Sequence, residues 1–517
     1  MLSRSFVPFQ RVDSFKGVNS KDTSENMLDG EWSEDSINIF SDPKGALGSR
    51  PGFSALTTAS IGTANAWCGF TQFRKHSGGA STDYFLGGGS NAKIYQFASN
   101  AYQLLHSGVT GLTITADTRF RFHTLDNICM ISYGGDPLKY TGSGSAATLS
   151  GTIVSADFGI EWQRYSWFHS MADPRLMYYC TTLGSVESGY SSFLNFDDDP
   201  YEVVGASKQS DDMLIFKLWS IFRVKYTGSS PIFRKYRVDT KVGAVSHDTI
   251  KELPDGRVIF AAPDFNVYIA QGDGIIPVGD NIKKILKAGV NARLKYAVAG
   301  LLYNRSQYWL SFTYASGATT HDRTLVMDWS RPYADKWGQI QYPWFIYSVS
   351  ANCYAETYVS GKSWLYHGGY TGLMYKDDTD TSDNEVKFTT TYKSKIFSMG
   401  DNSMEKKYSK LMLSYDNKGD YDLNISLVCD QNSATQKNIA QSMLGGVGYQ
   451  TLWDVGQWDV DYWASETDAD VGRDIDRTGK TIQVTFGTDT IDYAWNVNFF
   501  TILAKGLRRG TVRTRES

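Results

Sequence analysis

The sequence predicts an all-β protein: a β-propeller with an additional antiparallel, β-sandwich-like platform domain. Aromatic residues make up 14% of the chain, and 48 glycines stand against 12 prolines. This combination suits short strands joined by tight turns, because aromatic side chains fit a pleated surface and glycine supplies positive φ. Apolar runs of strand length recur in units of roughly 40 to 60 residues, a period typical of propeller blades. Helical periodicity is scarce.

Residues 1–53 are predicted to form an N-terminal arm that ends in a hairpin. The stretch SINIFSDPKGALGSRPGF (36–53) contains one short apolar strand, a turn, and a second apolar segment at Ala46 and Leu47. A hairpin ahead of the propeller is suited to leave its own domain and to pair with the C-terminal domain or a neighbouring subunit by β-augmentation. Pro51 and Gly52 then redirect the chain into the first blade.

Residues 54–380 are predicted to form the propeller. In STDYFLGGGSNAKIYQFASN (81–100), two apolar runs flank three glycines, which indicates a hairpin. The same plan recurs in FRFHTLDNICMISYGGDPLKYTG (120–142) and, later, in GKSWLYHGGYTGLMYKDD (361–378). The number of blades is expected to lie between five and seven. The one helical pattern, DNIKKILKAGVNARLKYAV (280–298), is interpreted as a connector between blades.

Residues 381–517 are predicted to form the smaller platform domain. A polar, acidic stretch, KDDTDTSDNEVKF (376–388), precedes segments that alternate with period two, such as KTIQVTFGTDT (480–490). The chain closes on a basic tail that contains Arg508, Arg509, Arg513 and Arg515. These four arginines are the candidate partner-binding residues, suited to phosphate or to an acidic surface, although a tail that only improves solubility has the same composition.

Charge and cysteine content exclude several classes of protein. A net charge of −4 provides no global basic field that would hold DNA or a membrane. The chain shows neither the apolar core of a secretion signal nor a run approaching the roughly 18 apolar residues of a membrane span. The five cysteines, at positions 68, 129, 180, 353 and 429, are too scattered for a disulfide framework or a zinc ribbon. They are expected to be buried thiols in a reducing cytoplasm.

Local motifs predict no catalytic, cofactor or metal site. The seven histidines form no HExxH pair, and the chain has no CxxC, GxSxG or Walker sequence. Acidic clusters at 197–199, 377–383 and 466–476 leave three interpretations open: calcium ligands, a glycosidase carboxylate pair, or solvated turns. Aromatic clusters at 161–169, 342–347 and 449–463 suit either sugar stacking or packing in cores and interfaces.

The N-terminal stretch resembles that of a known family. GVNSKDTSENMLDGEWSEDSINIFSDPKGALGSRPGF (17–53) is similar to the start of tail nozzle proteins of short-tailed, podovirus-type bacteriophages, also called tail tubular B or packaged-DNA stabilisation proteins. Further similar segments follow in the family's order: DPRLMYYCTT, DDMLIFKLWSIFRVKYTG, DTKVGAVSHDTIKELPDGRVIFAAPDFNVYIAQG and FFTILAKGLRRG. The common order of these segments, over about two thirds of the chain, carries the resemblance.

The resemblance implies a structural role in the virion tail. Such proteins form a ring, usually of six copies, below the portal and its adaptor ring. They extend and close the channel through which double-stranded DNA passes without sequence-specific binding, and they dock tail fibres or a spike or plug protein. The family has no catalytic residues or cofactors to assign here. The protein would be made in the cytoplasm of the host bacterium and would contact no membrane.

Two other functions remain as alternatives. One is a glycan-binding or glycan-degrading propeller of a phage tail, which would need a carboxylate pair about 5 to 9 Å apart in an aromatic-lined cleft. The other is a different tail component, such as a stopper or distal-tail protein. For the nozzle interpretation, deletion of residues 1–50 is expected to abolish ring assembly while the propeller still folds.

Overall fold

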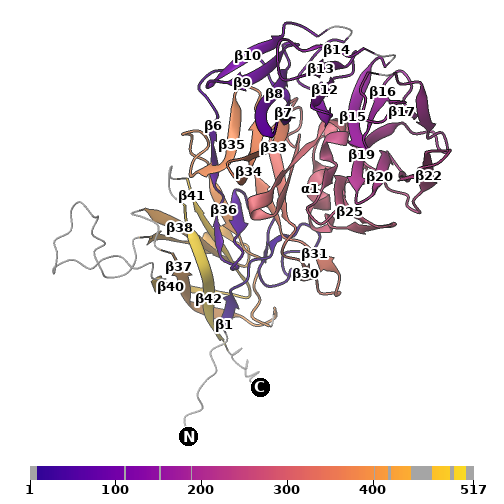
Figure 1. Ribbon diagram of the computed structural model, residues 1–517. Helices are drawn as coiled ribbons and strands as arrows, with labels where there is room; N and C mark the ends of the chain where they lie inside the picture. Colours follow the sequence, from indigo (N-terminus) through magenta and orange to yellow (C-terminus); the bar gives the residue numbers. More distant parts are fainter. Residues whose placement is uncertain are drawn as a thin grey trace, which may run out of the picture. The chain divides into compact units, whose positions relative to one another are not determined.

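Figure 1 shows the computed structural model, which describes residues 9–109, 112–150, 153–187, 189–400, 402–416, 421–443, 469–489 and 494–507. The chain divides into two compact units. The sandwich unit comprises Met1–Gly52, Arg331–Tyr347 and Asp380–Ser517, and the propeller unit comprises Phe53–Ser330 and Ser348–Thr379. In the described part of the chain, no helix has the length and apolar character needed to cross a bilayer.

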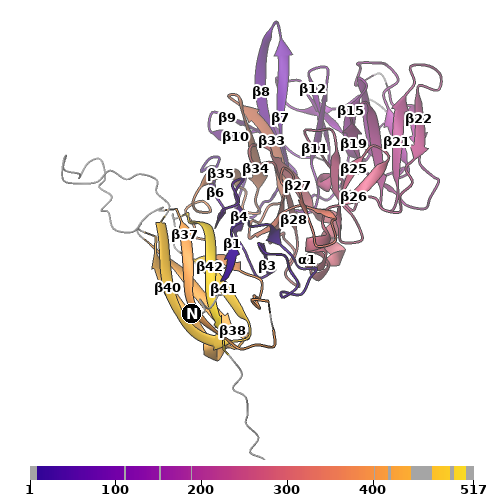
Figure 2. The same cartoon turned by 90° about the horizontal axis from the view of Figure 1, so that it is seen from below.

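The first three blades of the propeller unit are four-stranded antiparallel sheets whose strands follow one another in sequence. The first blade also contains the unit's longest hairpin, which extends past its neighbours in Figure 2. The strands of these blades are β7 (Trp67–Ser77), β8 (Ala80–Gly89), β9 (Ile94–Ala98) and β10 (Ala101–His106); β11 (Arg121–Leu125), β12 (Ile128–Ser132), β13 (Leu138–Tyr140) and β14 (Ala147–Thr148); and β15 (Ala156–Trp162), β16 (Tyr165–Ser170), β17 (Leu176–Tyr179) and β18 (Ser192–Asn195).

Four further blades bring the number formed by the described residues to seven, at the upper end of the expected range. Two of them again have four consecutive strands, whereas the propeller unit supplies three consecutive strands to the sixth blade, and the seventh takes β6 as its fourth strand. Their strands are β19 (Val203–Gln209), β20 (Asp212–Lys217), β21 (Ile221–Tyr226) and β22 (Phe233–Arg237); β23 (Lys251–Glu252), β24 (Val258–Ala261), β25 (Val267–Gln271) and β26 (Gly274–Pro277); β27 (Val298–Leu302), β28 (Gln307–Phe312) and β29 (Arg323–Asp328); and β33 (Cys353–Val359), β34 (Lys362–Gly368), β35 (Met374–Asp380) and β6 (Gly52–Ala55).

The ring closes because its two ends meet in the last blade. Strand β6, from the start of the unit, is the outer strand of the sheet β33-β34-β35-β6. The chain continues this pairing when Leu56 N donates to Met374 O at 2.8 Å. On the inner side, β33 packs against β7, the inner strand of the first blade. The inner edge of each blade then faces the centre of the closed ring, where it is protected from pairing with another chain.

Short helices connect the blades, as the sequence predicts for residues 280–298. The segment contains η2 (Asp280–Ile282), α1 (Lys283–Ala288) and η3 (Asn291–Tyr296), with Ile282, Ile285 and Leu286 buried. The other short 3-10 helices in the described residues are η1 (His247–Thr249), η4 (Tyr303–Arg305) and η5 (Ser433–Thr435).

The two larger sheets of the sandwich unit are antiparallel. Figure 2 shows β37, β40 and β42 side by side in the first of them. The first sheet has the order β4 (Ile39–Ser41), β5 (Leu47–Ser49), β42 (Asn496–Gly506), β37 (Lys406–Tyr415) and β40 (Ala469–Gly479), and β1 (Phe9–Val12) also pairs with β42; the second has the order β36 (Thr390–Lys393), β41 (Ile482–Thr488), β38 (Asp422–Cys429) and β39 (Lys437–Ser442). The predicted fold class, an all-β propeller with a sandwich-like domain, is confirmed.

The N-terminal arm is built into the sheets and core of the sandwich unit. Strand β1 pairs with β42 in the register Phe9↔Leu503, and β5 pairs with the beginning of the same strand. Phe15 is 2% exposed, and its ring lies 5.7 Å from that of Tyr392 and 6.3 Å from that of Phe500. Aromatic pairs at these separations contribute beyond their buried area. The arm therefore supplies core side chains to a domain whose other strands lie hundreds of residues later.

The RPGF corner is held by a buried arginine. The Arg50 side chain is fully buried and binds Asp383 through two nitrogens, at 2.8 and 2.5 Å. Its Nε donates to Asn38 Oδ1 at 2.9 Å, and its guanidinium lies 3.9 Å from the ring centroid of Phe388. Position 52 requires glycine, because a Cβ there would lie 1.9 Å from Ser382 O. Arginine's planar fork makes several directed bonds at once, so one residue fixes where the arm ends.

The segment Arg331–Tyr347 lies in the sandwich unit, although it falls within the range 54–380 that the sequence predicts to form the propeller. It contains β30 (Tyr333–Ala334), β31 (Ile340–Gln341) and β32 (Trp344–Tyr347). Gly17, at φ +99°, begins the parallel pair β2 (Gly17–Val18) and β3 (Glu31–Trp32), and a Cβ there would lie 2.6 Å from Trp344 N. The contact is between backbones, so sequence periodicity gives no sign of it.

The packing of the arm generates the first prediction. Phe15→Ala is expected to lower the free energy of unfolding of the sandwich unit by about 3–5 kcal/mol, because it removes a buried ring and leaves a cavity. Chemical denaturation followed by tryptophan fluorescence measures this. Phe9→Ala, on the same arm but with a ring that is 58% exposed, serves as the matched control and should change it by less than about 1 kcal/mol. Equal effects of the two substitutions would contradict the assignment.

Candidate functional site: the centre of the propeller

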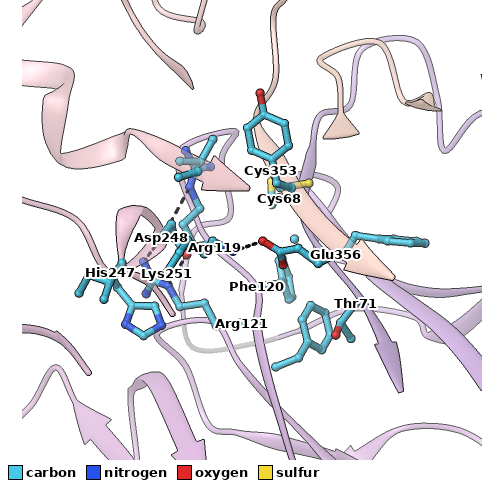
Figure 3. Close-up of a pocket in the computed structure, with 17 residues that line it drawn as sticks. Cys68, Thr71, Arg119, Phe120, Arg121, His247, Asp248, Lys251, Cys353 and Glu356 are labelled. Atoms are coloured by element: carbon cyan, nitrogen blue, oxygen red, sulfur yellow. Dashed lines mark hydrogen bonds and ion pairs between the residues drawn. The ribbon is translucent and has the colours of Figure 1, made fainter. Parts of the chain in front are cut away.

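A polar cavity of about 200 Å³ lies where the inner strands of the propeller converge. Figure 3 shows the residues that line it, among them Arg119, Arg121, Asp248, Lys251 and Glu356. The lining comes from β7, β11, β23, β27, β33 and the 3-10 helix η1, which together belong to five blades. Convergent polar groups in a concave site are the usual first candidate for a functional centre.

Arg121, the first residue of β11, joins three blades. Its Nη2 lies 2.7 Å from Asp248 Oδ2, and its Nε donates to Asp248 Oδ1 at 3.0 Å. Its Nη1 binds both the carboxylate and the carbonyl oxygen of Asp157, which is on β15. Asp248 is positioned by η1, whose N-cap Ser246 accepts a hydrogen bond from Asp248 N. Bidentate arginine–carboxylate pairs of this kind are geometrically specific.

Arg119 lies two residues earlier and points to the other side of the ring. Its Nη1 donates to Ala116 O at 2.9 Å and to Asn352 Oδ1 at 3.2 Å, and its Nη2 donates to Tyr296 O at 2.8 Å. Its Nε lies 3.8 Å from Asp248 Oδ2. These partners precede the inner strands of the second, sixth and seventh blades, so one buried side chain connects the two halves of the ring.

A further ion pair also lines the cavity. Lys251 Nζ lies 2.9 Å from Glu356 Oε1, and a dashed line marks this pair in Figure 3. The same carboxylate oxygen accepts the Leu301 backbone N–H at 3.0 Å. Each charged side chain that lines the cavity therefore has an oppositely charged partner inside the propeller. This arrangement favours a cross-link between blades over a site that captures a charged ligand.

The electrostatics reflect burial and pairing. Burial by itself would raise the pKa of Asp248, but the charge and hydrogen bonds of Arg121 outweigh it and lower that pKa to about 2. The pKa of Asp157 is also well below its ordinary value, because Arg121 and His169 outweigh the effect of burial. Burial would lower the pKa of Arg121, but both aspartates together raise it. The network thus stays ionised at neutral pH.

The nucleophilic and basic groups of the cavity are poorly suited to covalent chemistry. Burial raises the pKa of the Cys68 and Cys353 thiols to about 12, so neither is a thiolate at neutral pH. Burial also lowers the pKa of His247 to about 4. The imidazole of His247 stacks on Phe158, with ring centroids 4.3 Å apart. These side chains pack the wall of the cavity. All five cysteines are buried free thiols.

Most of the described carboxylates in the acidic clusters are paired with a basic side chain. Among the described residues, no group of three or more His, Cys, Asp or Glu side chains could hold a metal ion. Glu466 and Asp468 lie outside the described residues, and of Asp470 only the backbone is described. The ion pairs are Asp198 with Lys235, Asp199 with the buried Lys217, Asp378 with Arg305, Asp383 with Arg50, and Asp476 with Lys407. Asp377 Oδ1 lies 2.8 Å from His367 Nδ1, within hydrogen-bond distance.

The predicted partner-binding arginines, Arg508, Arg509, Arg513 and Arg515, lie outside the described residues, as does the aromatic cluster at 449–463. The aromatic cluster at 161–169 forms part of β15 and β16, where Trp162 and Trp167 are buried. The cluster at 342–347 overlaps β32, whose four residues are all buried. These two clusters are packing residues.

Sequence reasoning missed Arg119, Arg121, Asp157 and Asp248. A signal was present in TRFRFHT (118–124), where two arginines alternate with phenylalanines at the start of an inner strand. In a strand, alternate residues share one face. The carboxylates that pair with these arginines, Asp157 and Asp248, are 36 and 127 residues from Arg121. No local sequence pattern predicts this pairing.

Comparison with family models finds no match, and no curated protein matches the chain. Among solved structures, the chain is similar to BamB from Moraxella catarrhalis, with 10% identity, 71% of this chain and 97% of that chain covered, and a TM-score of 0.36. It is also similar to the extracellular domain of the putative one-component system BT4673 from B. thetaiotaomicron, with 9% identity, 78% and 57% covered, and a TM-score of 0.40. At these values neither likeness carries an argument about function.

The ion-pair network generates a stability prediction. Arg121→Gln is expected to lower the free energy of unfolding of the propeller by about 3–5 kcal/mol, because it removes the nearest cation from the half-buried Asp157 and Asp248 and leaves Asp157 without an arginine partner. Guanidinium denaturation monitored by circular dichroism measures the loss. Arg74→Gln breaks the exposed pair with Asp83 and is the control, expected to have a much smaller effect because solvent screens that pair. A loss for Arg121→Gln no larger than that of the control would contradict the role assigned to the network.

Buried histidines predict a loss of stability in mild acid. Burial lowers the pKa of His123 to about 3, of His247 to about 4 and of His321 to about 3, from an ordinary 6.5. Below pH 6.5 the unfolded chain binds protons that the folded chain does not, so stability is full above pH 6.5 and falls as pH decreases toward 4. Each histidine contributes a slope of about 1.4 kcal/mol per pH unit.

Denaturation midpoints measured between pH 7.5 and 5 test this. His123→Gln should reduce the slope of the free energy of unfolding against pH by the contribution of one histidine. The exposed His76 provides the control substitution, His76→Gln, which should leave the slope unchanged. A wild-type slope near zero between pH 6.5 and 5 would show that these imidazoles titrate alike in the folded and unfolded chains.

Proposed function

We propose that the protein is a non-enzymatic structural subunit of a phage tail, the tail nozzle, and that it acts as a ring of copies, six in the family it resembles. The observation that carries this proposal is the closed propeller centre. Its charged side chains form ion pairs that join the blades. The thiols of Cys68 and Cys353 and the imidazole of His247 are packed in the walls. A propeller organised in this way is suited to be a rigid building block.

The order of sequence motifs supports the same proposal. The GVN start, the LDGE segment and the RPGF corner, which carry the resemblance, are residues that tie the arm to the sandwich unit. A domain that includes its own N-terminal strands is a stable platform for contacts with other proteins. In the proposed ring, double-stranded DNA passes between subunits and not through a propeller, because Arg119 and Arg121 cross the propeller axis.

The proposed partners follow from the role. They are the adaptor ring above, a fibre, spike or plug protein below, and DNA in the lumen, all in the virion tail after synthesis in the host cytoplasm. The competing proposals are a glycan-binding or glycan-degrading propeller and another tail component, such as a stopper or distal-tail protein. At the propeller centre, the cationic partners of Asp248 and Glu356 count against a free carboxylate pair there.

Native mass spectrometry with negative-stain imaging tests the proposal. The purified chain, alone or with a portal–adaptor complex, is expected to form a ring with a central hole. A chain that stays monomeric with and without the adaptor would contradict the nozzle role. A glycan array would then test the glycan-binding alternative, whereas a ring of another copy number or tail position would favour a different tail component.

Deletion of residues 1–50 is a poor test of assembly alone. The deletion removes β1, β5 and Phe15 from the sandwich unit, so loss of a ring would also follow from loss of that fold. The propeller unit is expected to keep its own cooperative unfolding transition in the truncated chain, and calorimetry would resolve the two units.

A further inference from the structure

A second cavity, of about 250 Å³, lies within the sandwich unit and has a different charge pattern. Three separate segments of this unit build it: the entry of the arm, the turn of the arm hairpin, and the start of the inserted segment. The lining residues are Ser14, Phe15, Lys16, Pro43, Lys44, Gly45, Arg331, Pro332, Tyr333 and Pro343.

The hairpin turn that forms one wall is held rigidly. Asp42 Oδ1 accepts the Ala46 N–H at 2.8 Å, and Gly45 N donates to Asp42 O at 2.9 Å. Gly45 has φ +92°, which only glycine adopts without strain. From the inserted segment, Arg331 Nη2 donates to Ser41 O at 2.6 Å, and its Nη1 donates to Asp42 O. Lys44 is therefore presented from a fixed backbone.

The opposite wall positions a second lysine. Phe15 is anchored in the core, and the next residue, Lys16, donates its backbone N–H to Gly30 O at 2.8 Å. The Lys16 ammonium lies 5.8 Å from the ring centroid of Tyr333, which also lines the cavity. The hydroxyl of Tyr333 donates to Glu31 Oε1 at 3.1 Å, so the ring is held in place.

Positive charge at this cavity is not balanced by its lining. Lys16, Lys44 and Arg331 all line it, and no carboxylate does. Within the described residues, neither lysine takes part in an ion pair. The nearest acidic residues in sequence are occupied: Asp13 pairs with Arg11 at 3.2 Å, and Asp42 caps the turn. This contrasts with the propeller centre, where every lining charge has a partner.

We propose that this cavity binds a carboxylate side chain of an acidic, extended peptide segment of a partner protein. Three prolines and two aromatic rings give the walls an apolar surface against which the methylene groups of glutamate pack, while Lys16 and Lys44 attract the carboxylate. The site lacks the usual features of a phosphate site. No helix N-terminus lines it, and both Nη groups of Arg331 already donate to carbonyls. The inference does not depend on the ring proposal.

The test measures binding of a fluorescein-labelled decapeptide of alternating glutamate and alanine to the full chain, by fluorescence anisotropy at low salt. Lys16→Gln/Lys44→Gln is expected to weaken binding about tenfold and each single substitution about threefold, as for partly exposed charge pairs. Lys44→Arg keeps the charge and should keep the affinity. Lys287→Gln/Lys410→Gln removes the same charge from two other exposed positions and should change the affinity less than twofold.

Several results would overturn the proposal. These are no binding by the wild-type chain, equal weakening in the two double variants, or equal binding of a glutamine–alanine decapeptide. Displacement of the peptide by inorganic phosphate but not by acetate, at matched ionic strength, would instead identify a phosphate site. If the double variant melts at a lower temperature, Lys44→Gln alone decides, because Lys44 is exposed on a turn that its side chain does not hold.

Discussion

The propeller depends on one buried ion-pair network at its axis. Inner strands of a propeller present their side chains to a narrow centre, where polar groups lose contact with bulk water. A buried charge is tolerated only when it is paired and hydrogen-bonded. Arg121 meets this condition with Asp157 and Asp248, and Arg119 with Asp248, Asn352 and backbone carbonyls. Because the partners belong to blades far apart in the sequence, the same bonds that satisfy the charges also fix the blades relative to one another.

The sandwich unit assembles one core from three separate segments of the chain. Aromatic packing of Phe15 with Tyr392 and Phe500 supplies the apolar part. Arg50 adds directional hydrogen bonds to Asp383 and Asn38, and these bonds fix the position of the end of the arm. Hydrophobic burial is non-directional and tolerates many arrangements, whereas a bidentate arginine accepts few. The combination explains how a short arm finds one position against strands that follow it by hundreds of residues.

The two cavities differ in what their charges can do. At the propeller centre, each cation is paired with a carboxylate of the same chain. These ion pairs stabilise the fold and are not available to a ligand. In the sandwich unit, Lys16 and Lys44 face a proline-rich wall without a carboxylate in the lining. An unmatched charge near the surface costs little to keep, since water solvates it, and it remains available for a partner. This difference in charge pairing underlies our two proposals, a structural role for the propeller and peptide binding by the arm and its surroundings.

The sequence by itself determined the all-β class, because alternating apolar runs and glycine turns are local consequences of strand geometry. It also placed the change from propeller to platform near residue 380 and interpreted residues 280–298 as a connector. Only the tertiary structure decided that seven blades close through β6, that Arg331–Tyr347 joins the sandwich unit, and which carboxylates meet Arg119 and Arg121. These features join residues separated by tens to hundreds of positions. Periodicity records which face a side chain occupies but not what lies opposite it, and that pairing exists only once the chain has folded.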